Sequence, residues 1–210
     1  MKNFFMFLIL STLICNTMNA EGGLSVNGGV NFTHPSAPSP YGYKTGAGAQ
    51  LGCSYSLNLF SRFSIAPGIK ISYNTWKFDS FDYVEQKVDH GFREWEMSVP
   101  LSLSYTIPIR NANLMLLSGP QINYGLSNKL FTTIIVDGRD IGNTCNMYSD
   151  VTSGLIYKRF STSWNFGLNL SFAKHYIIGV NSSIGLSNIA KSASYEIRKN
   201  SYSVTFGYSF

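Results

Sequence analysis

Apolar and polar residues alternate with a period of two from Leu24 to the end of the chain. This is the period of a β-strand, whose successive side chains point to opposite faces. Eight such runs are present, and their apolar positions fall within residues 24–32, 47–57, 63–73, 95–105, 114–124, 164–172, 176–186 and 202–210. Each run can cross a bilayer, which takes about 9–11 tilted residues, whereas strands of globular proteins average about 5–6.

The polar face of these runs consists mainly of Gly, Ser, Asn, Thr and Gln, with few Lys, Glu or Asp. A soluble barrel of the lipocalin kind would turn this face to bulk water, where surfaces normally carry charges. Small polar side chains suit instead the crowded interior of a narrow barrel. The pattern therefore predicts an all-β fold, an eight-stranded antiparallel up-and-down transmembrane β-barrel with its apolar face in lipid.

Large aromatic residues gather near the ends of the runs, namely Tyr55, Tyr73, Trp76, Trp95, Tyr105, Tyr124, Trp164 and Tyr176. Transmembrane barrels carry girdles of aromatic residues at both membrane interfaces. We expect these eight side chains to form such girdles.

The connections between the runs alternate in length. Long connections fall at 34–42, 79–91, 127–159 and 189–200, and short ones near 58–61, 108–111 and 174–175. Outer-membrane barrels have short periplasmic turns and longer outer loops. The alternation therefore predicts a periplasmic N-terminus, with every long connection outside the cell. Because Leu130–Val136 has strand character, we expect the fifth and sixth strands to continue above the membrane as a hairpin.

Composition agrees with this architecture. The 210-residue chain is 44% hydrophobic and 13% charged, about half the charge of an ordinary soluble domain. The longest apolar run, Phe4 to Cys15, is shorter than the ~20 residues of a spanning helix, and the mean hydropathy is only +0.01. The net charge of +5 comes without a run of basic residues, so no nucleic-acid partner is predicted.

Residues 1–20 have the organisation of a cleaved export signal, with Lys2 before an apolar stretch and a candidate cleavage site after Ala20, although Met18 is bulky for its position before the cut. Ile14 stands where a lipoprotein signal carries a small residue, which disfavours lipid attachment at Cys15. We expect residues 21–210 to form the mature barrel domain, with its long outer loop at 127–159.

Two cysteines remain in the mature chain. An exported protein could join Cys53 to Cys145, but we expect Cys53 on a lipid-facing strand and Cys145 in a distant loop, and so no disulfide. No His/Cys spacing indicates a metal site, and no cofactor is predicted.

Three charged residues fall on the inward face of the predicted strands: Lys70 on the third, and Glu94 and Glu96 on the fourth. Unpaired charges in such an interior are costly, so we expect Lys70 to pair with a glutamate. This lumen charge cluster either fills the barrel as a structural group, or lines and gates a narrow path.

A histidine offers a different kind of chemistry. His90 shares its predicted outer loop with acidic residues, namely Asp79, Asp82, Glu85 and Asp89. Some outer-membrane barrels are enzymes that place His, Asp and Ser at the outer rim. A loop histidine among carboxylates is otherwise a solvated group, and these spacings lack the pattern of a Ca²⁺ loop. We predict neither a catalytic nor a metal site here.

The chain ends in Tyr-Ser-Val-Thr-Phe-Gly-Tyr-Ser-Phe, whose alternate positions are Tyr202, Val204, Phe206, Tyr208 and Phe210. This ending resembles the C-terminal assembly signal of bacterial outer-membrane proteins, which implies recognition by the outer-membrane assembly machinery. A last strand of this kind must also pair with the first, so that no open edge faces lipid.

Three internal segments resemble the PorT-like outer-membrane β-barrel family. They are Glu94–Tyr105 (EWEMSVPLSLSY), Leu117–Gln121 (LSGPQ) and Ile184–Ile189 (IGLSNI). The resemblance covers essentially the whole mature chain and implies an eight-stranded barrel in the outer membrane of a Gram-negative cell. Most members have no assigned biochemical role, and some assist protein secretion and gliding.

These features predict a non-enzymatic barrel of the cell envelope with a filled lumen. Its expected partners are outer-membrane lipid and lipopolysaccharide, and an extracellular or envelope protein reached through residues 127–159. One alternative is a small porin-like channel or secretion accessory with Lys70, Glu94 and Glu96 in the lumen. The other is a rim enzyme around His90.

Overall fold

The computed structural model describes residues 23–37, 42–78, 87–136, 139–149, 157–191 and 196–210, with the backbone alone for 87–89, 133–136 and 139–142. The strands are β1 (Gly23–Ser36), β2 (Tyr43–Phe60), β3 (Phe63–Phe78), β4 (Lys87–Ile109), β5 (Ala112–Val136), β6 (Arg139–Asn146), β7 (Phe160–Phe172), β8 (Tyr176–Gly185) and β9 (Arg198–Ser209). The predicted export signal lies outside the described residues. In the described part of the chain, no helix has the length and apolar character to cross a membrane.

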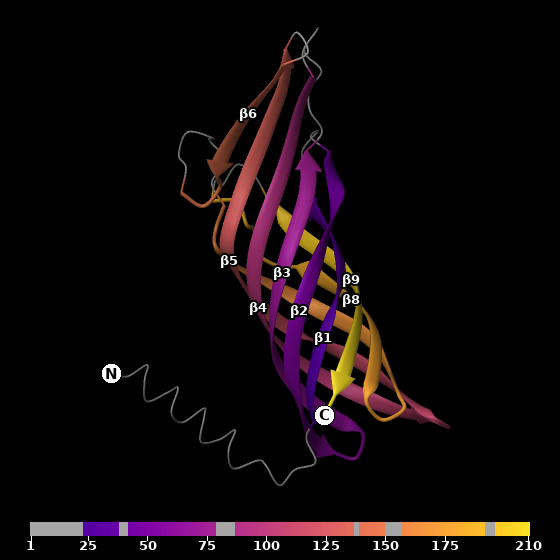
Figure 1. Ribbon diagram of the computed structural model, residues 1–210. Coiled ribbons are helices and arrows are strands. Elements are labelled where there is room, and N and C mark those ends of the chain that lie inside the picture. The colour runs from indigo at the N-terminus through magenta and orange to yellow at the C-terminus, as the bar shows by residue number, and fades with distance from the viewer. Residues whose placement is uncertain (1–22, 38–41, 79–86, 137–138, 150–156, 192–195) are drawn as a thin grey trace.

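Eight of these strands close into an antiparallel barrel in the order β1-β2-β3-β4-β5-β7-β8-β9. The sheet closes where β1 pairs with β9, from Ser25 opposite Ser209 to Ser36 opposite Arg198. Closure leaves no unpaired edge in the barrel wall, as a sheet in lipid requires. Figure 1 shows the strands strongly tilted around the barrel. The predicted eight-stranded barrel is confirmed.

Side chains follow the predicted alternation. On β1, Val30 is 51% exposed while its neighbour Asn31 is 2% exposed. The same contrast holds on β9 between Val204 on the outside and Ser203 on the inside. The barrel is therefore inside-out compared with a soluble protein, because its interior is polar and its outer surface apolar. Such a continuous apolar surface is stable in lipid.

The two ends of the barrel differ. One end, termed the short-turn end, carries the turns at Ser61–Arg62, Arg110–Asn111 and Ala173–His175. The opposite end, termed the long-loop end, carries the long connections. Ser61, Ala173 and Lys174 have positive φ angles of 48°, 48° and 67°, which suits tight hairpin turns. The predicted alternation of short and long connections is confirmed.

Strands at the long-loop end are longer than predicted. β4 begins inside the predicted loop 79–91, and β5 runs into the predicted loop 127–159. The part of β5 nearest the long-loop end, residues Lys129–Val136, pairs with β4 on one side and with β6 on the other. This part is termed the upper part of β5. The predicted hairpin forms, but between β5 and β6, because β7 begins only at Phe160. Figure 1 shows β4, β5 and β6 rising furthest from the barrel.

One predicted girdle residue lies elsewhere. Trp95, Tyr124, Trp164 and Tyr176 are exposed on the outer surface as expected, but Trp76 is only 1% exposed. Trp76 occupies an inward position near the end of β3, opposite Phe92 of β4. Strand phase places its ring inside the barrel, so its assignment to a girdle is wrong.

Candidate functional site

An ionic cluster crosses the barrel interior. Glu94 and Glu96 of β4 are buried, with 4% and 6% of their surface exposed. Lys199 of β9 donates to both carboxylates, and its Nζ lies 2.6 Å from Oε2 of Glu94. Three strands separate β4 from β9 in either direction around the barrel. Lys199 therefore reaches across the lumen from the opposite wall.

The oxygens of the two carboxylates accept further hydrogen bonds. The Tyr148 hydroxyl donates to Oε1 of Glu94 at 2.7 Å, and Asn74 Nδ2 donates to Oε2 at 3.3 Å. Ser98 Oγ donates to Oε1 of Glu96 at 3.4 Å. A buried ion pair is tolerated only when its remaining lone pairs and protons are satisfied in this way. The cluster has the features of a structural crosslink.

Lys70 does not form this ion pair. Its Nζ donates instead to Oε1 of Gln121 at 3.4 Å. The predicted pairing of Lys70 with a glutamate is therefore wrong, since the ion-pair partner is Lys199. Lys199 falls within the predicted loop 189–200, but it is the second residue of β9. It shares the inward phase of Ser201, so extending the alternating pattern by one step would have revealed it.

A polar cavity of about 120 Å³ lies in the lumen beside Lys70, towards the short-turn end. Hydroxyl and amide side chains line it, among them Ser25, Asn27, Ser54 and Asn169. This volume holds several water molecules, so the lumen is not packed solid below the ionic cluster.

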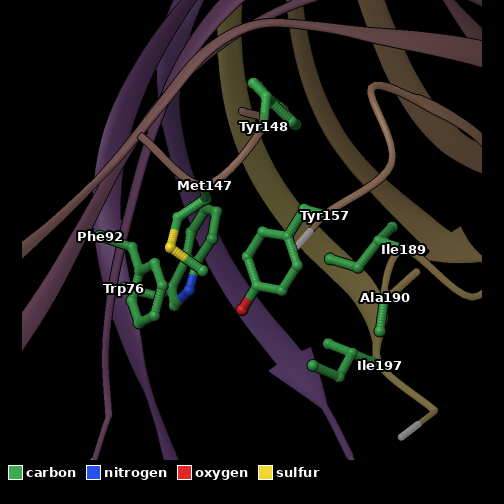
Figure 2. Close-up of a cluster of buried hydrophobic side chains, with 8 residues drawn as sticks. All are labelled: Trp76, Phe92, Met147, Tyr148, Tyr157, Ile189, Ala190 and Ile197. Carbon is green, nitrogen blue, oxygen red and sulfur yellow. The ribbon is translucent and has the colours of Figure 1, made fainter. Parts of the chain in front are cut away.

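An apolar cluster, termed the loop plug, closes the lumen at the long-loop end (Figure 2). It consists of Trp76, Phe92, Met147, Tyr148, Tyr157, Ile189, Ala190 and Ile197, each buried. The Phe92 ring stacks on the Trp76 ring at a centroid distance of 5.4 Å. The centroid of the Tyr157 ring lies 6.1 Å from that of Phe92. Figure 2 shows the Tyr157 ring between this aromatic pair and the three aliphatic side chains. Barrel wall and outer connections thus share one core.

Backbone hydrogen bonds hold the plug segments in place. Met147 N donates to Asn128 O on β5 at 2.9 Å, and Tyr157 N donates to Met147 O at 2.9 Å. Lys158 N donates to Ile189 O at 2.7 Å, which joins the connection before β7 to the one before β9. The described parts of the two connections therefore form a single folded cover.

Tyr148 links this cover to the ionic cluster. The Arg159 guanidinium lies 4.8 Å from the centre of the Tyr148 ring, a cation–π contact. Gly125 makes room for the ring, because a Cβ there would overlap the Tyr148 hydroxyl. Burial, followed by the nearby Glu94 carboxylate, raises the pKa of the Tyr148 phenol. Tyr148 therefore remains a protonated donor to Glu94.

His90 lies near the start of β4, where its Nδ1 is 3.0 Å from Thr132 Oγ1. The acidic residues predicted beside it are not described, either entirely (Asp79, Asp82 and Glu85) or in their side chains (Asp89). The rim enzyme around His90 therefore stays an untested alternative. Within the described residues, no group of His, Cys, Asp and Glu could hold a metal ion. Cys53 of β2 and Cys145 of β6 are free thiols.

The C-terminal residues line the outer surface of β9. Tyr202, Val204, Phe206, Tyr208 and Phe210 are all exposed, on the face that strand phase turns towards lipid. Phe210 N donates to Leu24 O at 2.8 Å, so the end of the chain is joined to β1.

A closed antiparallel sheet with an apolar outside and a polar inside defines a transmembrane β-barrel. The family described as "Outer membrane protein beta-barrel domain" matches residues 5–210. The chain belongs to this family, and its location is the bacterial outer membrane.

Several solved structures are similar to this chain. The outer membrane protein OprG from Pseudomonas aeruginosa is similar with a TM-score of 0.52 and 11% identity, over 92% of this chain and 98% of that one. Ail of Yersinia pestis in complex with the heparin analogue sucrose octasulfate has a TM-score of 0.45 and 17% identity, over 90% and 99%. The outer membrane enzyme PagL has a TM-score of 0.47 and 14% identity, over 87% and 97%. No curated protein sequence matches the chain.

Proposed function

We propose that this protein is a non-enzymatic, non-conducting barrel that presents its long connections as a folded platform for an envelope or extracellular partner. The contact between Lys199 and Glu94 across the lumen carries this proposal. A solute passing through the barrel would have to break this ion pair and then displace the loop plug. The carboxylates of the ion pair are hydrogen-bonded and the side chains of the loop plug are buried, which supports a permanently closed state.

The described part of this platform is folded. Residues 127–159, proposed as the partner-binding segment, contain the upper part of β5, all of β6 and the plug residues Met147, Tyr148 and Tyr157. The β5–β6 hairpin rises beyond the barrel (Figure 1), where a partner can reach it. A rigid binding surface loses less conformational entropy on association than a flexible one.

The proposal includes an orientation and an assembly route. The alternation of short turns and long connections supports a periplasmic N-terminus, which puts the loop plug on the outside of the cell. The exposed residues of β9 support the role of Tyr202 to Phe210 as the signal read by the assembly machinery. The segments named above support PorT-like membership within the family.

A small channel is the second candidate, favoured by the polar cavity beside Lys70. Conductance of the purified protein in planar bilayers separates the two. We expect no steady current from the native protein. The double variant Lys199→Ala with Trp76→Ala removes one group from the ion pair and one from the loop plug, and we expect it to show channel openings. The matched control is Lys158→Ala with Trp95→Ala, which changes the same residue types outside the lumen. A steady current from the native protein would establish the channel.

A further inference from the structure

Basic residues gather on the outer surface of the barrel at the long-loop end. Lys44, Lys77, Arg93 and Lys129 are all exposed. They come from β2, β3, β4 and β5, which are consecutive in the sheet and lie side by side in Figure 1. Arg93 and Lys129 lie on the outward face. Arg93 is two residues from the exposed Trp95 on β4, and Lys129 is two residues from Ser127, the partner of Trp95 on β5. These four residues are termed the basic patch.

The strand register places like charges directly opposite each other. Lys44 is the partner of Lys77 across β2 and β3, and Arg93 is the partner of Lys129 across β4 and β5. Directly opposed like charges destabilise a sheet. Two such pairs lie next to each other, since Lys77 is diagonal to Arg93 across β3 and β4. A bound anion between Lys77 and Arg93 would offset the repulsion between these two side chains.

The centre of the patch is hollow. Gly91 lies between Lys77 of β3 and Phe131 of β5 in the same row of the sheet. A Cβ at Gly91 would have no atom within 4 Å, so the space above it is open. The Arg93 guanidinium lies beside this space, 4.4 Å from the centre of the Phe131 ring. This cation–π contact holds the guanidinium in place, and a positioned guanidinium binds phosphate oxygens with two hydrogen bonds.

The position of the basic patch relative to the membrane surface indicates the source of the anion. Tyr73 and Trp95 are partners on the outer surface, with ring centroids 5.1 Å apart. Aromatic residues of this kind mark the level of the lipid headgroups. Arg93 lies two residues before Trp95 on β4, which is about 7 Å along a strand. The basic patch is therefore at the headgroup level, within reach of lipid phosphates.

From this geometry we infer that the basic patch is a binding site for the phosphate groups of an outer-leaflet lipid headgroup, with one phosphate above Gly91 between Lys77 and Arg93. The choice of leaflet rests on the proposed orientation of the barrel. The site itself depends only on the register of β2 to β5.

Affinity for lipid A tests this site on the purified full-length protein in detergent, with native mass spectrometry as the readout. The test variant is Lys77→Gln with Arg93→Gln and Lys129→Gln. A matched control removes three exposed charges elsewhere, through Lys158→Gln, Lys191→Gln and Arg110→Gln. A basic group near an anionic lipid surface contributes about fivefold in affinity. We therefore expect the test variant to bind lipid A roughly 100-fold more weakly than the native protein and the control.

A second variant acts without removing any basic group. Gly91→Glu places a carboxylate in the hollow, and we expect it to weaken lipid A binding as well, whereas Gly91→Ala should change it little. Chemically dephosphorylated lipid A should bind the native protein no better than it binds the triple variant. A gel shift on boiling shows for each variant that the barrel has folded.

Equal affinity of the native protein, the triple variant and Gly91→Glu for lipid A would overturn the inference. Sucrose octasulfate competing fully with lipid A at equal concentration would also overturn it, because the site would then be a general polyanion site. Conductance and orientation do not depend on these three side chains. If the lipid-phosphate site is refuted, the closed-barrel proposal therefore still stands. If the barrel proves to conduct, the lipid-phosphate site still stands.

Discussion

Lys199 of β9 and Glu94 of β4 join opposite walls of the barrel through a contact of 2.6 Å between Nζ and Oε2. The two residues are 105 positions apart in the chain. Tyr148 binds the other oxygen of the same carboxylate, so the crosslink also holds the outer cover. One buried carboxylate therefore connects three parts of the molecule, namely both walls and the loop plug.

Removing Lys199 should destabilise the barrel strongly. The variant Lys199→Met leaves Glu94 and Glu96 buried without their cation, and breaking one side of a buried pair costs about 3–5 kcal/mol. Urea unfolding of the protein in lipid vesicles, followed by tryptophan fluorescence, measures this loss. Lys70→Met is the matched control, since Lys70 makes a single long hydrogen bond with Gln121 and should cost less.

The combined variant Lys199→Met, Glu94→Gln and Glu96→Gln should recover much of that stability, because no unpaired charge remains. If Lys199→Met alone unfolds at the same urea concentration as the native protein, the cross-lumen pair is not a structural crosslink.

Gly125→Ala should loosen the outer cover while the barrel stays folded. The added Cβ overlaps the position of the Tyr148 hydroxyl, so Tyr148 must leave Glu94. Hydrogen exchange of Met147 and Tyr157 amides should become faster, because both donate hydrogen bonds that hold the plug. Gly91→Ala serves as the control, since nothing lies near its added Cβ. Unchanged exchange in Gly125→Ala would contradict the role of Tyr148.

Two tryptophans of neighbouring strands should respond differently to truncation. Trp76→Ala leaves a cavity in the loop plug and should cost about 3–5 kcal/mol of unfolding free energy. Trp95 is 50% exposed on the outer surface, where lipid can refill the space, so Trp95→Ala should cost clearly less. Urea unfolding in vesicles compares the two, and equal losses would place Trp76 outside a packed core.

Trypsin added to intact cells tests the orientation. Cleavage is expected after Lys158, Arg159 or Lys191, which are exposed at the long-loop end. Arg62 and Arg110 lie in the short turns and should be cut only after the outer membrane is permeabilised. Mass spectrometry of the fragments identifies the sites. Cleavage at Arg110 in intact cells would reverse the proposed orientation.

Strand phase could be read from the amino-acid sequence. Lipid contacts one face of every strand, so residues such as Val30 and Val204 reveal by local alternation which way they point. The lengths of the connections depend only on where that alternation stops, so the barrel order and its two unlike ends follow as well. The same pattern correctly placed Glu94 and Glu96 inside.

The pairing inside the barrel could not be read in this way. Which inward residues meet across the lumen depends on the tilt and register of all eight strands, and this arrangement brought Lys199 rather than Lys70 to the glutamates. The loop plug is equally non-local. Met147 and Tyr157 lie in the connection between β6 and β7, which lacks periodicity. They become core residues only because closure of the barrel gives them a shared space above Trp76 and Phe92.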